Sequence, residues 1–549
     1  MTEDHQIDAS GPSTRANRWD RRALFVLLPL IAILAAMVFV YPRQWTRGFL
    51  VNEEMMFVQQ ARDIAAGNGY ITSTIYPVFA DDIESIPMPE LLRPPGYQLV
   101  VAAALTLGFT DYAAAVGVSI LWLAIAVVTF GYLAHRLLGS HRVALLLVGI
   151  YLATSTTLVH ATMAVPEMQF DALFLLACVA LLRVSPRRCL GAGVALAALG
   201  ATKTYGLLYA PIALAYVAWV TLRPNGESAP AAPAARLLRT AGVLLAGMAL
   251  TSLAIGTLAS TPSGMVASST STYALNFMME TEAYPQVDAP RHDLDPLDPW
   301  DYFAGRPSEL AIKVLRIMSR TPAVLNVMGD PPLAGMLMAM LLVTAALALT
   351  LGWPTDQPWQ RRYLWFSSAA IVVTLPLLWL FLVRIRYLYQ LYPLMLILIA
   401  TQAQRFAPGW ERLSRTARRA VTAVVVTVLI VYPLALNLRI AHRAPAAFLG
   451  RGLAVHVLDY ATLASDIRDH LPGDGPLVSE FAFEIPWLTG RAAIFPPLTP
   501  DQLTWIIDRW DITGIVLRAS DEQPPTPPGF ELRLRREGYT LFWRNAPAR

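Results

Sequence analysis

The sequence predicts a polytopic α-helical membrane protein with about eleven transmembrane helices and a small α/β domain at its C-terminal end. Three observations support this prediction. The 549 residues are 55% hydrophobic and only 15% charged, which is too apolar for an ordinary soluble enzyme of this length. Apolar runs close to the ~20 residues needed to cross a bilayer recur between Ala23 and Leu436. The residues after about 440 have the composition of a globular domain instead.

The first apolar run covers residues 23–41 and follows a short N-terminal tail, residues 1–22. Arg15, Arg18, Arg21 and Arg22 precede the run, and basic residues beside a first helix keep that end in the cytoplasm. Because no small-residue cleavage site ends the run, we expect a retained helix rather than a signal peptide.

Ten further apolar runs bring the expected count to about eleven. They cover residues 112–134, 143–164, 167–183, 189–202, 204–222, 240–258, 332–351, 363–383, 388–404 and 420–437. Basic loops fall on every second connection, which predicts that they are cytoplasmic and that the transmembrane region ends near 439. The sequence therefore predicts a multi-pass membrane protein with a cytoplasmic N-terminus.

Three segments are then expected outside the membrane on the extracytoplasmic side. The first is the loop 42–111, whose apolar stretch 96–109 is too short to cross and is expected to lie in the interface. The second is the loop 259–331, which ends in an amphipathic stretch, 310–328, expected on the membrane surface. The third is the C-terminal domain, 440–549. Its expected elements are a helix at 459–470, strands at 476–480 and 492–495, a helix at 501–509, a strand at 514–518 and a hairpin at 530–544.

Charge and cysteine content exclude other classes of protein. The formal net charge is +4, and the basic residues lie between apolar runs rather than in one stripe, so nucleic acid is not an expected partner. The two cysteines, Cys178 and Cys189, belong to one short stretch and support neither a disulfide framework nor a metal site.

Ionisable residues of both signs gather near the expected outer face. They are Glu53, Glu54, Arg93, Glu167, Asp171, Lys203, Arg384 and Arg386. Such a set could hold an anionic lipid phosphate with its cations while an acid withdraws a proton nearby. Structural roles compete with this interpretation: the two late arginines could anchor a helix end, Glu167 could start a helix, and Lys203 could be a loop lysine.

Several short motifs, in chain order, resemble one family. They are Glu53-Glu54-x-x-Phe57-x-x-x-Ala61-Arg62, Gly67-Asn68-Gly69-Tyr70, Arg93-Pro94-Pro95-Gly96-Tyr97, Pro166-Glu167-x-x-Phe170, Thr202-Lys203 with Gly206, Arg384-x-Arg386-Tyr387-x-x-x-Leu391-Tyr392-Pro393, and Leu488-Thr489-Gly490-Arg491. Together they resemble the GT-C superfamily of polyprenyl-phosphate-sugar glycosyltransferases. The closest branch contains the bacterial relatives of protein O-mannosyltransferases and aminoarabinose transferases, which are similar to glycosyltransferase family 39.

The resemblance implies a hexosyl- or pentosyltransferase that moves a sugar from a polyprenyl-phosphate donor to a hydroxyl acceptor on a glycan, lipid or protein. Glu53 aligns with the family's catalytic base, where relatives more often have Asp, so the choice between Glu53 and Glu54 stays open. The resemblance gives donor-phosphate binding to Arg93, Lys203, Arg384 and Arg386, acceptor positioning to Glu167 with Asp171 beside it, and places in the site to Tyr97 and Tyr387. A divalent cation, Mg²⁺ or Mn²⁺ on Glu53 and Glu167, is left open and no cofactor is certain.

Other functions compete. A polyprenyl-lipid flippase or small-molecule transporter would also be rich in helices and poor in charge, although it would favour internal repeats and broken helices at mid-membrane depth. An oligosaccharyltransferase would carry a Trp-Trp-Asp motif, and only Trp300-Asp301 and Trp510-Asp511 occur. A structural or sensor protein is the third alternative. The sugar and the acceptor cannot be read from the sequence.

Overall fold

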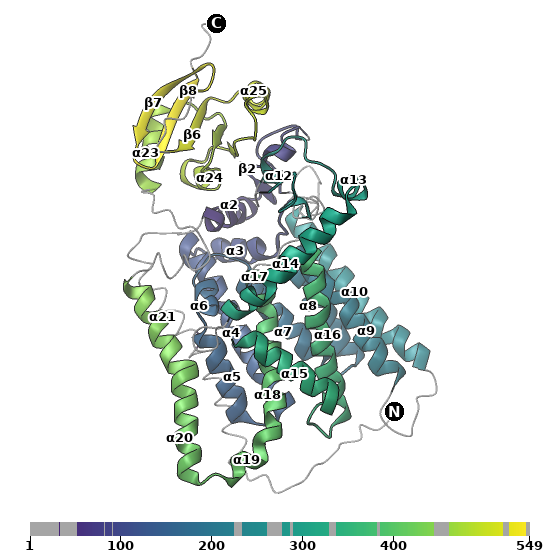
Figure 1. Cartoon of the computed structure of the whole chain (residues 1–549). Coiled ribbons are helices and arrows are strands. Elements are labelled where there is room, and N and C mark those ends of the chain that lie inside the picture. The colour runs from purple at the N-terminus through teal and green to yellow at the C-terminus, as the bar shows by residue number, and fades with distance from the viewer. Residues whose placement is uncertain are drawn as a thin grey trace.

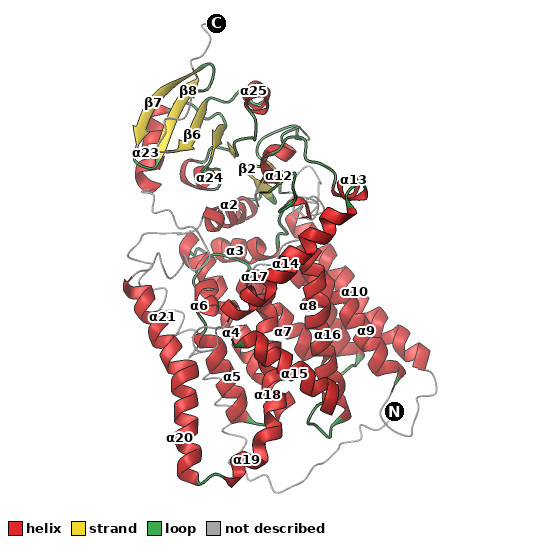
Figure 2. Ribbon diagram, in the orientation of Figure 1, coloured by secondary structure: helices red, strands yellow, loops and turns green. Residues whose placement is uncertain are grey.

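The computed structural model describes Ala32 and residues 52–81, 83–90, 92–223, 233–260, 277–285, 289–328, 336–380, 385–443, 460–519 and 526–544. The expected N-terminal tail lies outside the described residues, and so does the expected first helix, apart from Ala32. A helical body occupies one end of the molecule and a sheet the other, with α2 (Asn52–Ala65) and α3 (Gly96–Thr106) between them (Figure 1). The strands are confined to the sheet end (Figure 2).

Five helices among the described residues are long and apolar enough to cross a membrane. They are α4 (Asp111–Leu138), the continuous stretch of η2 (Thr204–Leu208) and α9 (Tyr209–Leu222), α10 (Pro233–Ala259), α16 (Pro358–Leu380), and α20 (Arg415–Val426) continued through η5 (Thr427–Val431) and α21 (Tyr432–Arg443). The shorter helices of the body are α7 (Glu167–Leu181), α8 (Pro186–Thr202), α15 (Leu337–Leu351) and α18 (Tyr392–Ala403). The expected count of eleven spans is therefore not confirmed.

The helix expected over 143–164 is not continuous. The structure has α5 (His141–Ala153) and α6 (Ser155–Ala161), which meet at an angle of 67°. Thr154 lies between them with an extended backbone. The hydroxyls of Thr154 and Thr157 donate to carbonyls of the last turn of α5, at 2.9 Å and 2.6 Å. Threonine hydroxyls that satisfy backbone carbonyls locally offer an alternative to a continued helix, so the run of polar residues permits this break.

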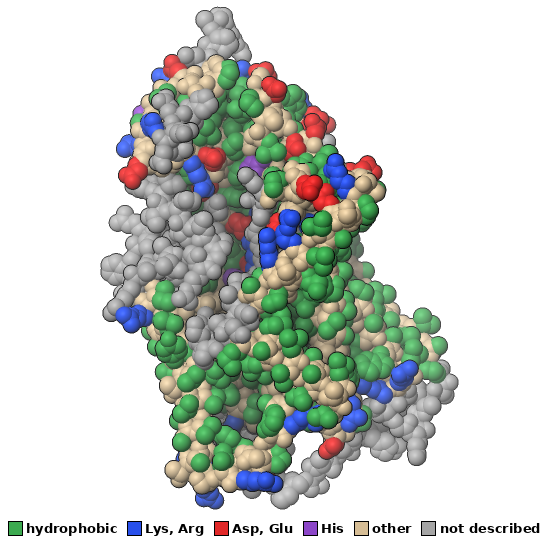
Figure 3. All heavy atoms as spheres, in the orientation of Figure 1, with side chains coloured by type: hydrophobic (Ala, Val, Ile, Leu, Met, Phe, Trp, Pro, Cys, Tyr) green, Lys and Arg blue, Asp and Glu red, His purple; other side chains and the backbone are tan. Residues whose placement is uncertain are grey.

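Close helix packing in the body uses glycine. A Cβ on Gly193 of α8 would lie 2.1 Å from the carbonyl oxygen of Leu244 in α10, and one on Gly247 would lie 2.7 Å from that of Leu190. Small residues on both helices therefore let the two backbones approach, as is usual between membrane helices. Hydrophobic side chains cover much of the visible sides of the body (Figure 3), which suits a lipid environment.

The remaining elements connect the body to the sheet or cap its ends. They are β1 (Ile71–Thr72), η1 (Pro77–Phe79), β3 (Met88–Pro89), α12 (Ala289–His292), α13 (Pro299–Ala304), α14 (Pro307–Met328), α17 (Ile385–Leu388), η3 (Tyr389–Leu391), η4 (Gln404–Phe406) and α19 (Ala407–Arg412). Helix α3 has 11 residues, which is too short to cross a bilayer. Its expected place in the membrane interface stays a prediction.

The C-terminal part folds as the expected mixture of helices and strands. Its elements are α23 (Tyr460–His470), β4 (Leu477–Ser479), α24 (Glu484–Thr489), β5 (Ala493–Ile494), α25 (Pro500–Arg509), β6 (Gly514–Arg518), β7 (Phe530–Arg536) and β8 (Tyr539–Arg544). Among these, only α24 has no counterpart in the sequence prediction. The six-stranded sheet has the order β2-β5-β4-β6-β8-β7, parallel from β2 to β6 and antiparallel at β8 and β7.

The edge strand β2 (Thr74–Ile75) comes from the first loop, far from the other strands in sequence. It pairs in parallel with β5, and the Thr74 hydroxyl donates to the carbonyl of Ala482 at 2.8 Å. Beside it, the ring of Tyr76 stacks on that of Phe495 with centroids 5.1 Å apart. The first loop is therefore part of the C-terminal sheet, which fixes the position of α2 relative to that sheet.

Candidate active site

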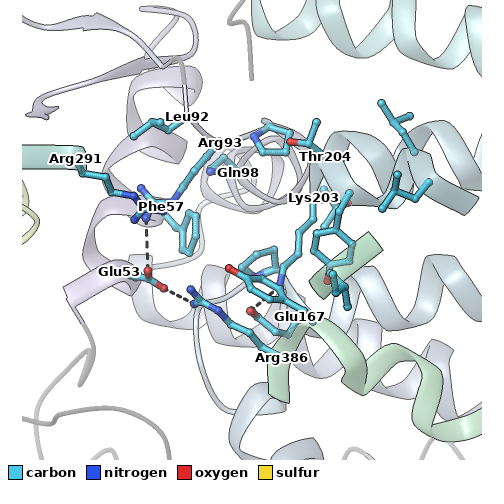
Figure 4. A pocket seen from close by; sticks show the side chains of 18 of the residues that line it. Glu53, Phe57, Leu92, Arg93, Gln98, Glu167, Lys203, Thr204, Arg291 and Arg386 are labelled. Atoms are coloured by element: carbon cyan, nitrogen blue, oxygen red, sulfur yellow. Dashed lines mark hydrogen bonds and ion pairs between the residues drawn. The ribbon is translucent and has the colours of Figure 1, made fainter. Parts of the chain in front are cut away.

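A cavity of about 250 Å³ lies where α2 meets the sheet-facing ends of the helical body. Glu53 and Phe57 of α2 line it, together with Arg93, Glu167 at the start of α7, Lys203 at the end of α8, and Arg386 and Tyr387 of α17. The labelled side chains come from these separate elements and converge (Figure 4). Six of the ten residues expected in the site line this cavity: Glu53, Arg93, Glu167, Lys203, Arg386 and Tyr387.

Glu53 stands in the first turn of α2 and joins two arginines. Its Oε2 lies 3.0 Å from an Arg386 guanidinium nitrogen, and its Oε1 lies 3.5 Å from one of Arg93 (Figure 4). Burial disfavours the charged carboxylate, but Arg386, Arg93 and Arg291 outweigh that effect and lower the pKa of Glu53 to about 2. The carboxylate is therefore ionised at any physiological pH.

Lys203 and Glu167 form a second ion pair across the cavity. The Lys203 Nζ donates to the Glu167 Oε1 at 2.7 Å, and both side chains are largely buried. Lys203 also lies about 6 Å from the centroids of three aromatic rings, those of Phe170, Tyr205 and Tyr387. An ammonium among aromatic faces keeps its charge at low desolvation cost, so the aromatic residues stabilise a cation at this position.

The cavity carries an excess of positive charge. Arg93, Lys203, Arg291 and Arg386 face only two carboxylates, those of Glu53 and Glu167, among the residues that line it. Guanidinium and ammonium groups partly withdrawn from water bind phosphate oxygens strongly. The lining thus suits an anion with about the charge of a phosphate ester.

The C-terminal part of the chain helps to hold these cations. The Arg93 guanidinium lies 5.6 Å from the ring centroid of Phe483 and 5.5 Å from that of Phe57, so an aromatic ring from each part contacts it. Arg291 lies 5.8 Å from the ring of Tyr76, the residue that packs against the sheet. The sheet therefore contributes to the geometry of the cavity without supplying its charged groups.

Three other residues expected in the site, Glu54, Asp171 and Tyr97, do not line this cavity. Glu54 is fully buried, and its Oε1 accepts from the backbone nitrogen of Ala164 at 2.6 Å. Asp171 is buried in the bundle and accepts from the Tyr151 hydroxyl at 3.2 Å. Tyr97 donates to the carbonyl of Ala115 at 3.0 Å within the α3 and α4 contact. Arg384 lies outside the described residues.

Arg291 and Phe483 are the residues that sequence reasoning missed. Arg291 belongs to α12 in a stretch rich in acids and prolines, where one arginine carries no signal of its own. Phe483 precedes α24, a helix that the sequence prediction did not contain. Arg291 lines the cavity, whereas Phe483 packs on the Arg93 guanidinium without being a lining residue. Both positions depend on how distant parts of the chain pack, so local sequence could not have found them.

A divalent cation does not fit this arrangement. Four cationic side chains share the cavity with Glu53 and Glu167, and each of these acids already forms an ion pair. No group of three or more His, Cys, Asp or Glu side chains suited to a metal occurs within the part of the chain that the structure describes. Repulsion by four like charges opposes a metal on these two carboxylates.

Solved structures share this fold. ArnT from Cupriavidus metallidurans, bound to undecaprenyl phosphate, matches with a TM-score of 0.53 at 14% identity, over 97% of this chain and 99% of that one. The archaeal oligosaccharyltransferase AglB from Archaeoglobus fulgidus, in complex with an inhibitory peptide and a dolichol-phosphate, matches with a TM-score of 0.54 at 12% identity, over 91% and 70% of the two chains. An Archaeoglobus fulgidus oligosaccharyltransferase complex with Zn and sulfate matches with a TM-score of 0.57 at 12% identity, over 89% and 68%.

These structures are GT-C glycosyltransferases, so the expected GT-C-like fold is confirmed. The apolar helices and this fold together make the chain a membrane protein. No family model matches the sequence. No curated protein sequence matches it either. At 12% to 14% identity this likeness establishes the fold.

Proposed function

We propose that this chain is an integral-membrane glycosyltransferase that moves a sugar from a polyprenyl-phosphate donor to a hydroxyl acceptor on the extracytoplasmic side. The main observation behind this proposal is the cavity in which four cations surround two carboxylates at the end of an apolar bundle. A lipid phosphate needs both a cationic site for its head and an apolar path for its chain. Two structures of this fold hold such lipids, namely undecaprenyl phosphate in ArnT and dolichol-phosphate in AglB.

In this proposal Glu53 is the base. It accepts the proton of the acceptor hydroxyl, the hydroxyl oxygen bonds to the anomeric carbon, and the bond between that carbon and the phosphate oxygen breaks. The polyprenyl phosphate leaves with the electron pair, and one displacement inverts the configuration. Arg93, Lys203 and Arg386 stabilise the phosphate as its charge grows, with Arg291 in the same cavity. The additional roles expected for Arg384, Glu54 and Asp171 remain predictions.

The low pKa of Glu53 has a consequence for this chemistry. A carboxylate held by two arginines is a weak base, because efficient proton transfer needs a pKa nearer to the working pH. Arg93 and Arg386 are also the groups expected to bind the donor phosphate. Binding of the donor would draw their charge away from Glu53 and make the carboxylate a better base only when the donor is present.

The test is transfer of a labelled sugar from synthetic polyprenyl-phosphate donors by the purified full chain. Glu53→Gln keeps the shape of the side chain and removes the base, and we expect transfer to fall by ~10² to 10⁴-fold. Glu84→Gln, an exposed acid in the same loop, is the control and should keep full activity. Wild-type turnover in Glu53→Gln would remove Glu53 as the base. Translocation of the lipid without any sugar transfer by the wild type would favour the flippase or transporter instead.

A further inference from the structure

A small basic hollow lies at the other end of the helical body. Arg136 in the last turn of α4, Arg183 after α7 and Arg188 in the first turn of α8 line it, together with Tyr132, Leu182 and Trp359. Its volume is about 130 Å³. Three arginines from three places in the sequence therefore converge on one space, which distinguishes it from scattered basic residues on loops.

The hollow is remote from the candidate active site. Glu167 begins α7 and Lys203 follows α8, whereas Arg183 follows α7 and Arg188 is near the start of α8, so the two sites lie at opposite ends of the same two helices. A helix of 17 residues such as α8 is about 26 Å long. That length approaches the thickness of a bilayer core, so the hollow is at the opposite membrane surface.

Positive charge in the hollow is not neutralised by the described part of the protein. No acidic residue is among its lining residues, and none of the three arginines forms an ion pair with a described residue. The N-termini of α8 and α16, near Arg188 and Trp359, add partial positive charge, whereas the C-terminal ends of α4 and α7, near Arg136 and Arg183, add partial negative charge. The net positive charge therefore comes from the three arginines. An arrangement of this kind lowers its energy when an anion binds.

Size and surroundings restrict the anion. Pockets for drug-sized ligands measure about 300 to 1,000 Å³, so a space of about 130 Å³ suits one headgroup phosphate rather than a nucleotide. Trp359 and Tyr132 flank the arginines, and such aromatic residues favour the level of lipid headgroups. Leu190 and Val194 follow Arg188 on α8, and 42% and 43% of their surfaces are exposed. The acyl chains of a lipid bound at the hollow would contact these two residues.

We propose that Arg136, Arg183 and Arg188 bind the phosphate of an anionic phospholipid in the membrane leaflet opposite the candidate active site. The guanidinium groups bind the phosphate oxygens, and the apolar face of α8 contacts the acyl chains. The shared chemistry is a phosphate group, and a free phosphate ion is the other source that the test has to distinguish. This site is independent of sugar transfer, because none of its residues lines the candidate active site.

The experiment compares lipid binding by native mass spectrometry of the full chain in detergent, with anionic phosphatidylglycerol as the probe and zwitterionic phosphatidylcholine, which has no net charge, as the reference. The double variant Arg136→Gln/Arg188→Gln should retain several-fold less phosphatidylglycerol than wild type. Arg187→Gln is the matched control, since it removes the same charge from the adjacent exposed residue, which does not line the hollow. The single variant Arg188→Gln serves if the double variant does not fold, and it should show a smaller loss.

A second arm separates the two sources of phosphate. Lipid binding is repeated with millimolar inorganic phosphate, and the melting temperature of lipid-free protein is measured with the same salt. We expect phosphatidylglycerol but not inorganic phosphate to raise the melting temperature of wild type. Stabilisation by inorganic phosphate that is lost in Arg188→Gln would assign the hollow to a free ion. Equal loss of lipid in Arg187→Gln and in the hollow variants, or no loss in any, would overturn the proposal.

Discussion

Glu484 is expected to make the protein less stable as pH rises. It is the first residue of α24, which packs against α2, and it is 3% exposed. Its Oε2 is buried and has no hydrogen-bond partner among the described residues. Burial raises the pKa of Glu484 to about 7, although backbone groups at the helix start and Arg518 favour the charged form.

The sign follows from comparing the folded and unfolded chains. Below pH 4.5 the carboxyl is protonated in both states, so burying it adds no ionisation penalty to the free energy of folding. Between pH 4.5 and about 7 the unfolded chain releases the proton while the folded protein keeps it, so the free energy of unfolding falls as pH rises. The difference between the two pKa values corresponds to about 3 kcal/mol, which is fully lost above pH 7.

Glu484→Gln removes this dependence because the amide stays neutral at every pH. We expect the apparent melting temperature of the variant, followed by tryptophan fluorescence in detergent, to exceed that of wild type at pH 8 and to match it at pH 4. Glu537→Gln, an exposed acid on the turn between β7 and β8, is the control and should follow wild type at both pH values. A Glu484→Gln variant with the same pH dependence as wild type would refute the reasoning.

Three further predictions concern the candidate active site. Lys203→Gln leaves the buried Glu167 without its cation and should lower the rate of sugar transfer by about a hundredfold or more. Lys203→Arg keeps a cation beside Glu167 and should recover part of that rate. Equal activity of the two variants would contradict the ion-pair role. Gly96→Ala places a Cβ 2.6 Å from a backbone carbonyl of α8 and should lower the free energy of unfolding by about 1 to 3 kcal/mol in thermal unfolding. Gly117→Ala is the control: its Cβ would meet nothing within 4 Å, so the free energy of unfolding should not fall. Phe483→Ala removes one of the rings against a cavity arginine and should raise the KM for the lipid donor. The melting temperature should fall as well, because the ring also packs against Tyr76 and Phe495, and an unchanged KM would show that the ring only packs.

Composition and periodicity predicted the class of protein and most of its helices. The long apolar runs gave α4, α9, α10 and α16 near their expected bounds, because a helix that faces lipid must be apolar along its length. The C-terminal strands were also expected, since β-branched and aromatic runs between turn residues mark strands. The break between α5 and α6 was not predicted, because an average over an apolar window does not register one threonine-rich turn.

The candidate site, too, was predicted in part from the sequence. The sequence marked Glu53, Arg93, Lys203 and Arg386 as charged residues in an apolar chain, and all four line the cavity. It could not separate Glu53 from its neighbour Glu54, since adjacent residues of a helix point about 100° apart and only packing decides which one faces the cavity. The structure turns Glu53 to the arginines and buries Glu54 against a backbone amide.

Sequence alone thus determined that this is an apolar helical membrane protein with charges of both signs near one expected surface, because those properties depend on residue type and local spacing. Tertiary structure decided which charges share a cavity and which do not. It also brought Arg291 into the cavity and β2 into a sheet whose other strands lie some 400 residues later. Contacts over such separations depend on how distant elements pack, and no local pattern in the chain encodes them.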